Sequence, residues 1–226
     1  TRGYTAVVDA EHASRITGST FAHDRISADG SLYRAFGRPP VNEEEGTTPI
    51  VLALHGRAGW VRPLAGDRDA LGLTGDGAGI LHPRARFYAG GMQSVRGFAE
   101  NELGPRVLQA RNASLLAAGC TNATIADGSC DPSGVPSGDL FPRPVGGSSV
   151  VEGSVELRVP LMKQLGGVLF VDGAYVGTGG LDSPAHGKGA ITPGGGFRYR
   201  SPLGVLRIDV GLRPVGSERL PGVAAV

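Results

Sequence analysis

Seven segments of the chain alternate between apolar and polar side chains with a period of two. Residues 150–161 are the clearest case, because the glutamates 152 and 156 fall on the face opposite the valines and leucines. Such alternation predicts a β-strand with one apolar and one polar face. The predicted strands are residues 1–13, 21–36, 49–62, 150–161, 166–177, 190–200 and 205–213. Asp29-Gly30, within the second segment, is compatible with a turn or a bulge, so the register of that strand is left open.

Two folds fit strands that place a charge at every second position. In a barrel wall the apolar side chains face lipid and the charged ones line a wet lumen. In a soluble β-sandwich the apolar side chains face a core and the charged ones face solvent. Bacterial single-chain barrels have even strand numbers, so a barrel interpretation of seven strands predicts that at least one strand is missing.

Residues 64–146 show no sustained alternation and are too long for an ordinary connection. Within them, residues 86–98 combine the aromatic pair Phe87-Tyr88, the double glycine Gly90-Gly91 and a single arginine, Arg96. Glycine allows backbone segments to pack closely, and a solvent-facing loop has no need of so many large apolar residues. This stretch therefore predicts a loop that folds back into an enclosed space, with Arg96 as its anchor.

Composition and charge narrow the function. The chain contains 38 glycines, 16 prolines and 40% hydrophobic residues, which suits many strands separated by turns. A net charge of +1 without a basic run gives no support for a nucleic-acid partner. No segment approaches the ~20 apolar residues of a membrane helix, although barrel strands need only ~9–11.

Sites for chemistry are not predicted. Leu54-His55-Gly56 resembles half of a hydrolase oxyanion loop, but no nucleophile elbow accompanies it, and His55 is expected to be a lumen-facing polar residue. The five histidines lack metal-ligand spacing. We therefore expect no catalytic residue, metal or cofactor, and no enzymatic activity.

The two cysteines, Cys120 and Cys130, lie in a polar segment without a nearby histidine, which disfavours a metal site. They indicate either a local disulfide, which implies an oxidising compartment, or two unrelated buried thiols. The sequence starts at Thr1, with neither an initiator methionine nor a signal peptide. We therefore expect it to be a mature or excised fragment.

The motif of residues 86–98, followed by Glu102-Leu103-Gly104-Pro105, resembles the signature loop of the BamA/TamA-type outer-membrane assembly family, also called the bacterial surface antigen family. The tetrapeptide Val95-Arg96-Gly97-Phe98 matches the hallmark of that loop. Residues 154–157, 169–173 and 197–204 resemble the strands that follow it.

This resemblance implies an all-β fold, an antiparallel transmembrane β-barrel of sixteen strands with a long inward-folded loop. Residues 1–226 would be the C-terminal portion of the barrel, with about seven strands, and residues 64–146 would be the signature loop. On this reading the POTRA domains, the first strands and the last strand are absent.

The resemblance also implies roles for single residues. Arg96 would reach into the lumen and pair with acidic residues on the next two strands, which here are Glu156 and Asp172. The remaining expectations are a close approach of Gly97 to the wall, a packing role for Phe98, and a disulfide between Cys120 and Cys130.

The implied function is the assembly, insertion or translocation of outer-membrane proteins in a Gram-negative bacterium. The implied partners are unfolded outer-membrane protein clients, the lipid bilayer, and lipoproteins or other proteins bound to POTRA domains. A two-partner secretion pore, the barrel anchor of a fused passenger enzyme, and a soluble β-sandwich binding module are the alternatives.

Overall fold

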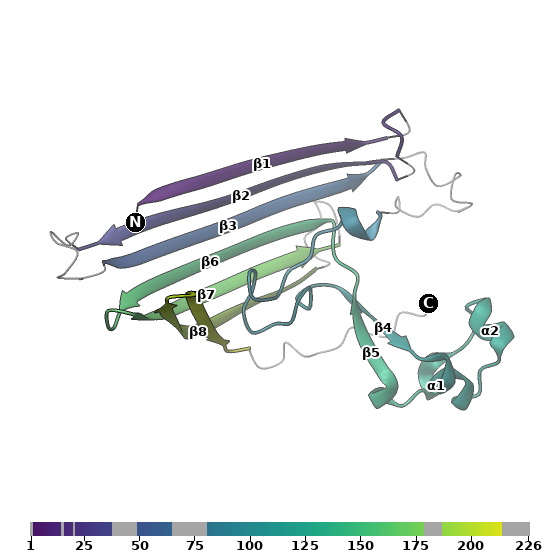
Figure 1. Cartoon of the computed structure of the whole chain (residues 1–226). Helices are drawn as coiled ribbons and strands as arrows, with labels where there is room; N and C mark the ends of the chain where they lie inside the picture. The colour runs from purple at the N-terminus through teal and green to yellow at the C-terminus, as the bar shows by residue number, and fades with distance from the viewer. Residues whose placement is uncertain are drawn as a thin grey trace.

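The computed structural model of the chain contains one antiparallel sheet of seven strands, which neighbour one another in sequence order (Figure 1). It describes residues 2–14, 16–19, 21–37, 49–64, 81–178 and 187–213. The strands of this sheet are β1 (Gly3–Ala13), β2 (His23–Phe36), β3 (Ile50–Pro63), β6 (Ser149–Pro160), β7 (Leu165–Gly177), β8 (Gly187–Ser201) and β9 (Gly204–Gly211). The all-β prediction and its seven strands are confirmed, because a period of two is the direct consequence of side chains alternating across a sheet.

The turn or bulge that the sequence left open at Asp29-Gly30 does not form. Strand β2 runs through them without a turn or a bulge, and Gly30 is paired with Ala6 of β1 and Gly56 of β3. Neighbouring strands on both sides supply regular backbone partners at this point. The surrounding sheet therefore overrides the local turn preference of the dipeptide.

The register of the sheet separates two faces. Leu54, Val155 and Val171 are paired in one row across β3, β6 and β7, and their side chains are partly or largely exposed on the convex face. On the concave face, Ser154 and Asp172 occupy the adjacent row. In the described residues no second sheet covers the convex face, which is the arrangement of a barrel wall in lipid and not that of a sandwich.

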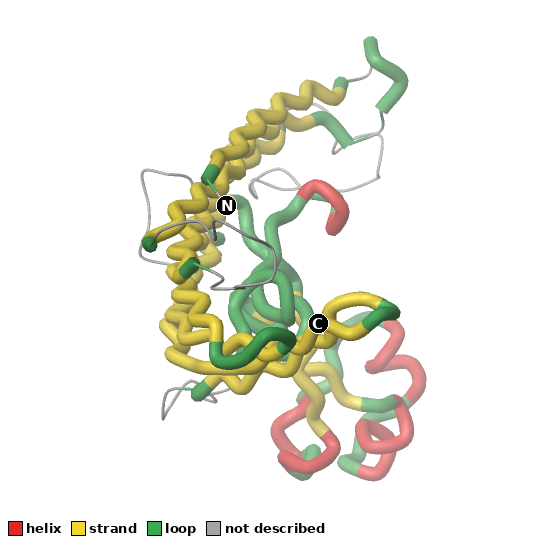
Figure 2. The backbone as a smooth tube through the Cα atoms, turned by 60° about the vertical axis from the view of Figure 1, so that its left-hand side comes forward, coloured by secondary structure: helices red, strands yellow, loops and turns green. Residues whose placement is uncertain are grey.

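The connection from β3 to β6 has two parts in the described residues. The inner segment (residues 81–105) lies against the concave face, and Figure 2 shows it inside the bend of the sheet. The outer tip (residues 106–144) projects away from the sheet in both views (Figures 1 and 2). It consists of the hairpin strands β4 (Arg106–Ala110) and β5 (Leu140–Pro144) and the helices α1 (Asn112–Ala117) and α2 (Asn122–Ala126).

None of these tip elements was predicted, because each has only five or six residues. Segments of that length show too little periodicity to be recognised in a sequence. No helix in the described residues is long and apolar enough to cross a membrane.

The hydrophobic core lies between the inner segment and the concave face. The inner segment contributes six of its ten buried side chains and the sheet four, so the inner segment is part of the fold. The cluster consists of Val61, Val150, Ala174 and Val176 from the sheet and Ala85, Phe87, Ala89, Val95, Phe98 and Leu103 from the inner segment. Fully burying a side chain such as valine or phenylalanine contributes about 1.5–3 kcal/mol, so this core holds the segment against the wall.

Candidate functional site

A tight turn presents Arg96 to the concave face. Gly90, Gly91 and Gly97 adopt φ angles of 104°, 105° and 100°, which are strained for residues with a side chain. The amide of Gly91 donates to the carbonyl of Phe98 at 3.1 Å, which closes the turn at its base. Val95, which is fully buried, and Arg96 are thereby directed toward the sheet.

Arg96 contacts two carboxylates of the neighbouring strands. Its Nε and Nη2 donate to the two oxygens of Asp172 at 2.7 and 2.8 Å, and its backbone amide donates to the same carboxylate at 3.1 Å. Its Nη1 donates to Glu156 at 2.7 Å. Paired, charge-assisted bonds of this kind fix the orientation of a planar guanidinium as well as its position. The structure thus brings together the three residues that the sequence singled out.

Further wall residues contact Arg96 that the sequence did not indicate. The Asp209 carboxylate on β9 accepts from Nη1 at 3.2 Å. The ring of Phe170 on β7 lies under the guanidinium, with its centroid 3.4 Å from Cζ. Phe170 lies two residues before Asp172 on the same face of β7, and that spacing is the signal by which the sequence could have indicated it.

Glycines on β8 and β9 make room for this arrangement. A Cβ atom at Gly211 would lie 2.6 Å from the carbonyl oxygen of Arg96, and one at Gly194 would lie 2.2 Å from the ring of Phe170. The wall is therefore recessed where the turn meets it. Gly97 lies against this recess, with its hypothetical Cβ at 3.3 Å from the carbonyl oxygen of Gly211.

Two arginines, Arg57 on β3 and Arg213 two residues after the end of β9, reach in the opposite direction, toward the inner segment. Arg57 on β3 donates to the carbonyl of Tyr88 at 2.7 Å and to Glu152 at 2.8 Å. Arg213 donates to the carbonyl of Gly97 at 3.1 Å. Alternation places both side chains on the concave face, but the sequence contains no signal for their partners in the loop.

Phe98 and Glu102 complete the contact with Arg213. The guanidinium carbon of Arg213 lies 4.5 Å from the ring centroid of Phe98, and its Nη1 donates to Glu102 at 3.2 Å. Burial raises the pKa of Glu102, but the amide of Ala99 and the guanidinium of Arg213 outweigh this effect and hold the pKa below its ordinary value.

The carboxylates around Arg96 are shared with three more arginines. Arg158 donates to Glu156 at 2.6 Å, while Arg198 and Arg207 both donate to Asp209. Burial by itself lowers the pKa of Arg96, but its bonds to Asp172, Glu156 and Asp209 raise it above its ordinary value. Arg96 therefore remains charged, and removing it would leave buried carboxylates without their central counter-ion.

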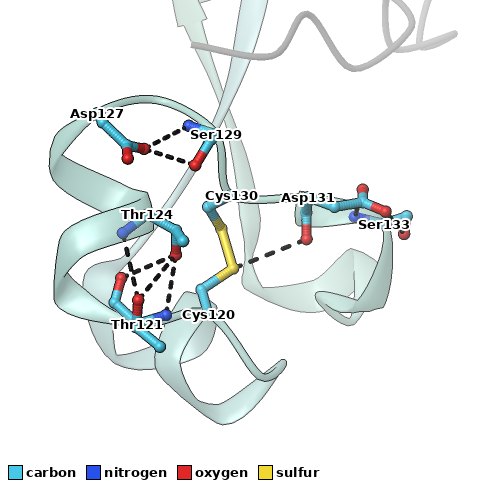
Figure 3. Close-up of a disulfide and its surroundings, with 8 residues drawn as sticks. All are labelled: Cys120, Thr121, Thr124, Asp127, Ser129, Cys130, Asp131 and Ser133. Atoms are coloured by element: carbon cyan, nitrogen blue, oxygen red, sulfur yellow. Dashed lines mark hydrogen bonds between the residues drawn. A yellow bond between two sulfur atoms is a disulfide. The ribbon is translucent and has the colours of Figure 1, made fainter.

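In the described residues the outer tip is held by local bonds, and one ion pair, between Arg106 Nη1 and Glu102 Oε1 at 3.7 Å, joins its base to the inner segment. A disulfide joins Cys120 and Cys130, with their Cα atoms 5.6 Å apart (Figure 3). Thr121 and Thr124 cap α2 reciprocally, each side chain bonding the backbone of the other. No bond in this group reaches the seven-stranded sheet.

The contacts of Arg96 hold the loop against the sheet. The charged groups around Arg96 form ion pairs with one another. Among the described residues, no group of three or more His, Cys, Asp or Glu side chains could hold a metal ion. The arrangement fixes a loop to β6, β7 and β9 through one guanidinium.

Comparisons with known proteins agree with this architecture. The family model of the Omp85 superfamily domain matches residues 1–219. No match was found among curated proteins. Among solved structures, the crystal structure of BamA from Haemophilus ducreyi lacking POTRA domains 1–3 is similar, with a TM-score of 0.57 and 19% sequence identity.

The structural match covers 96% of this chain and 36% of that BamA chain. At this identity it shows a common fold. The family model, which spans nearly the whole sequence, shows more: the chain belongs to the Omp85 superfamily.

Proposed function

We propose that the chain forms part of an outer-membrane β-barrel that inserts or translocates other outer-membrane proteins. The observation that carries the proposal is the contact of Arg96 with carboxylates from three strands, Glu156, Asp172 and Asp209. Membership of the Omp85 superfamily and the fold shared with a BamA barrel support it.

The mechanism is physical. A client strand that enters a bilayer unpaired leaves backbone groups without partners, each at a cost of several kcal/mol. A barrel can lower this cost by offering a wall whose shape is already fixed. The Arg96 contacts tie the inner segment to β6, β7 and β9, so that the lumen and the adjoining wall keep one conformation while clients are handled.

The location and partners follow from the same proposal. The exposed apolar side chains of the convex face would contact the lipids of the outer membrane of a Gram-negative bacterium. Unfolded outer-membrane proteins would be the clients. Lipoproteins and POTRA-bound proteins would be accessory partners of the intact protein, and none of these steps needs a cofactor.

A charge-swap experiment in the intact protein tests the proposal. Arg96→Glu places a fourth carboxylate among Glu156, Asp172 and Asp209, and we expect assembly of outer-membrane clients into lipid vesicles to fall. Adding Asp172→Arg restores a pair of opposite sign and should recover part of the activity. Arg143→Glu, a reversal on the exposed outer tip, is the matched control and should leave the activity unchanged.

Activity is normalised to the amount of folded barrel in each sample, which separates loss of function from loss of protein. Normal client assembly by folded Arg96→Glu protein would refute the role of the anchored loop. The role is supported if Arg96→Glu combined with Asp172→Arg recovers part of the activity and Arg96→Glu combined with Arg143→Glu does not.

A further inference from the structure

A basic cavity lies at the end of the sheet where the shortest connections join the strands, residues 161–164 and 202–203. Its volume is about 450 Å³. Five cationic side chains line it and, among the described residues, no carboxylate does. These are Arg158, Lys163, Arg198, Arg200 and Arg207.

The charge of this cavity is incompletely compensated. Arg158, Arg198 and Arg207 bond to Glu156 and Asp209, which Arg96 also uses. For Lys163 and Arg200, the described part of the chain provides no ion pair. The five cations of the cavity and Arg96 carry six positive charges, whereas the carboxylates near them, Glu156, Asp172 and Asp209, carry three negative ones.

The register places like charges next to each other. Arg198 on β8 is paired directly with Arg207 on β9, and Asp209 bonds to both. Like charges directly opposite in a sheet destabilise it. An anion that enters the cavity would relieve this repulsion, which is a reason for the site to bind one.

The wall of the cavity is fixed by the fold. The amide of Arg200 donates to the carbonyl of Gln164 at 2.8 Å, and the hydroxyl of Tyr199 contacts the side chain of Gln164 at 3.3 Å. The β6–β7 turn is thereby tied to β8. The backbone that carries Lys163 and Arg200 is thus fixed, and the exposed side chains of these two residues order when an anion binds.

The spread of the cations indicates the shape of the ligand. They come from β6, the β6–β7 turn, β8 and β9, and three strand spacings correspond to roughly 14 Å across the sheet. A single phosphate is too small to meet them all. An extended peptide with acidic side chains at alternate positions spans about 13 Å from residue i to residue i+4.

We infer that this cavity binds an extended, acidic protein segment through carboxylates at alternate positions. Four of its five cations are arginines, whose planar donors match carboxylates in pairs. In bacterial barrels the short turns face the periplasm, so the segment would arrive from that side. The inference goes beyond the proposed function, because it requires neither client insertion nor the Arg96 contact.

Binding of labelled peptides to the intact protein in detergent tests the inference. The probe is a synthetic peptide with glutamates at every second position, and the same peptide with lysines is its control. Lys163→Gln with Arg200→Gln removes two cations without leaving any carboxylate of the described residues unpaired. Arg111→Gln with Arg143→Gln removes the same charge from exposed positions of the outer tip.

We expect the glutamate peptide to bind to the unaltered protein, and the Lys163/Arg200 variant to bind it at least about tenfold more weakly. The Arg111/Arg143 variant should bind it like the unaltered protein, and the lysine peptide should not bind. If both variants lost the same share of the affinity for the glutamate peptide, the loss would reflect net charge alone, and the inference would be overturned. Binding of inorganic pyrophosphate without binding of the glutamate peptide would overturn it as well, in favour of a small-anion site.

Discussion

The inner segment and the outer tip belong to the same connection, yet different interactions hold them. The inner segment is fixed by long-range contacts, with Val95 fully buried and Arg96 bonded to three strands. The outer tip is fixed by short-range ones, the Cys120–Cys130 disulfide and the caps of α2. The first depends on the barrel wall for its shape, and the second does not.

This difference separates two roles within one loop. The inner segment shares its core with the wall. It can therefore change conformation only together with the wall, because the packing and the ion pairs belong to both. The outer tip projects from the sheet and has its own disulfide, so its sequence and conformation can change without disturbing the lumen.

The largest effect is expected from Arg96→Met. It leaves Glu156, Asp172 and Asp209 close together without their central counter-ion, and breaking a buried ion pair of this kind costs about 3–5 kcal/mol. Thermal unfolding of the intact protein in detergent measures the loss. Arg143→Met on the outer tip, an exposed arginine, is the control and should unfold at the same temperature as the unaltered protein.

A smaller loss is expected from Gly211→Ala. The added Cβ would lie 2.6 Å from the carbonyl oxygen of Arg96, and accommodating an extra methyl group in a packed site costs about 1–3 kcal/mol. The matched change is Gly138→Ala on the outer tip, where no atom lies within 4 Å of the added methyl. Equal stability of the two variants would mean that the turn does not rest against β9.

Acidification should weaken the contact of Glu102 with Arg213. The folded pKa of Glu102 lies below its ordinary value of 4.5, so its contribution is complete above that value and is lost as the pH falls through the lowered pKa. We expect about 1 kcal/mol or less, since the pair is partly exposed. Comparing unfolding of the unaltered protein and Glu102→Gln between about pH 6 and pH 3 isolates this contribution, and parallel curves would contradict it.

The smallest effect on the barrel is expected from Cys120→Ser with Cys130→Ser. Loss of the disulfide should speed proteolytic cleavage within the outer tip, because it closes only a short loop there. The unfolding temperature of the barrel should remain unchanged. A clear fall in that temperature would contradict this expectation and show that the outer tip and the lumen are coupled.

The sequence predicted the sheet well because alternation is a local signal. Strands β6 and β7 begin and end within one residue of the predicted segments, and Glu156 and Asp172 lie on the expected face. The sequence left the conformation of Asp29-Gly30 open because its preference for a turn is local, whereas the pairing that overrides it comes from β1 and β3.

The site was only partly predictable for a related reason. The motif around Arg96 and its resemblance to a family indicated Glu156 and Asp172. The contacts of Asp209, Arg57 and Arg213 depend on the depth to which the loop enters and on the register of distant strands. Alternation shows that such charges face inward, and it does not show which groups they meet.

The accessibility of residue 95 tests directly whether Arg96 holds the loop inside the barrel. Val95→Cys in the intact protein is treated with a water-soluble maleimide, and Met92→Cys, at a position that is 65% exposed, serves as the reference. If Arg96 holds the loop inside the barrel, Val95→Cys reacts far more slowly than Met92→Cys, and adding Arg96→Glu brings the two rates together. Rapid labelling of Val95→Cys with Arg96 intact would contradict the account, because the turn would then not be buried against the wall.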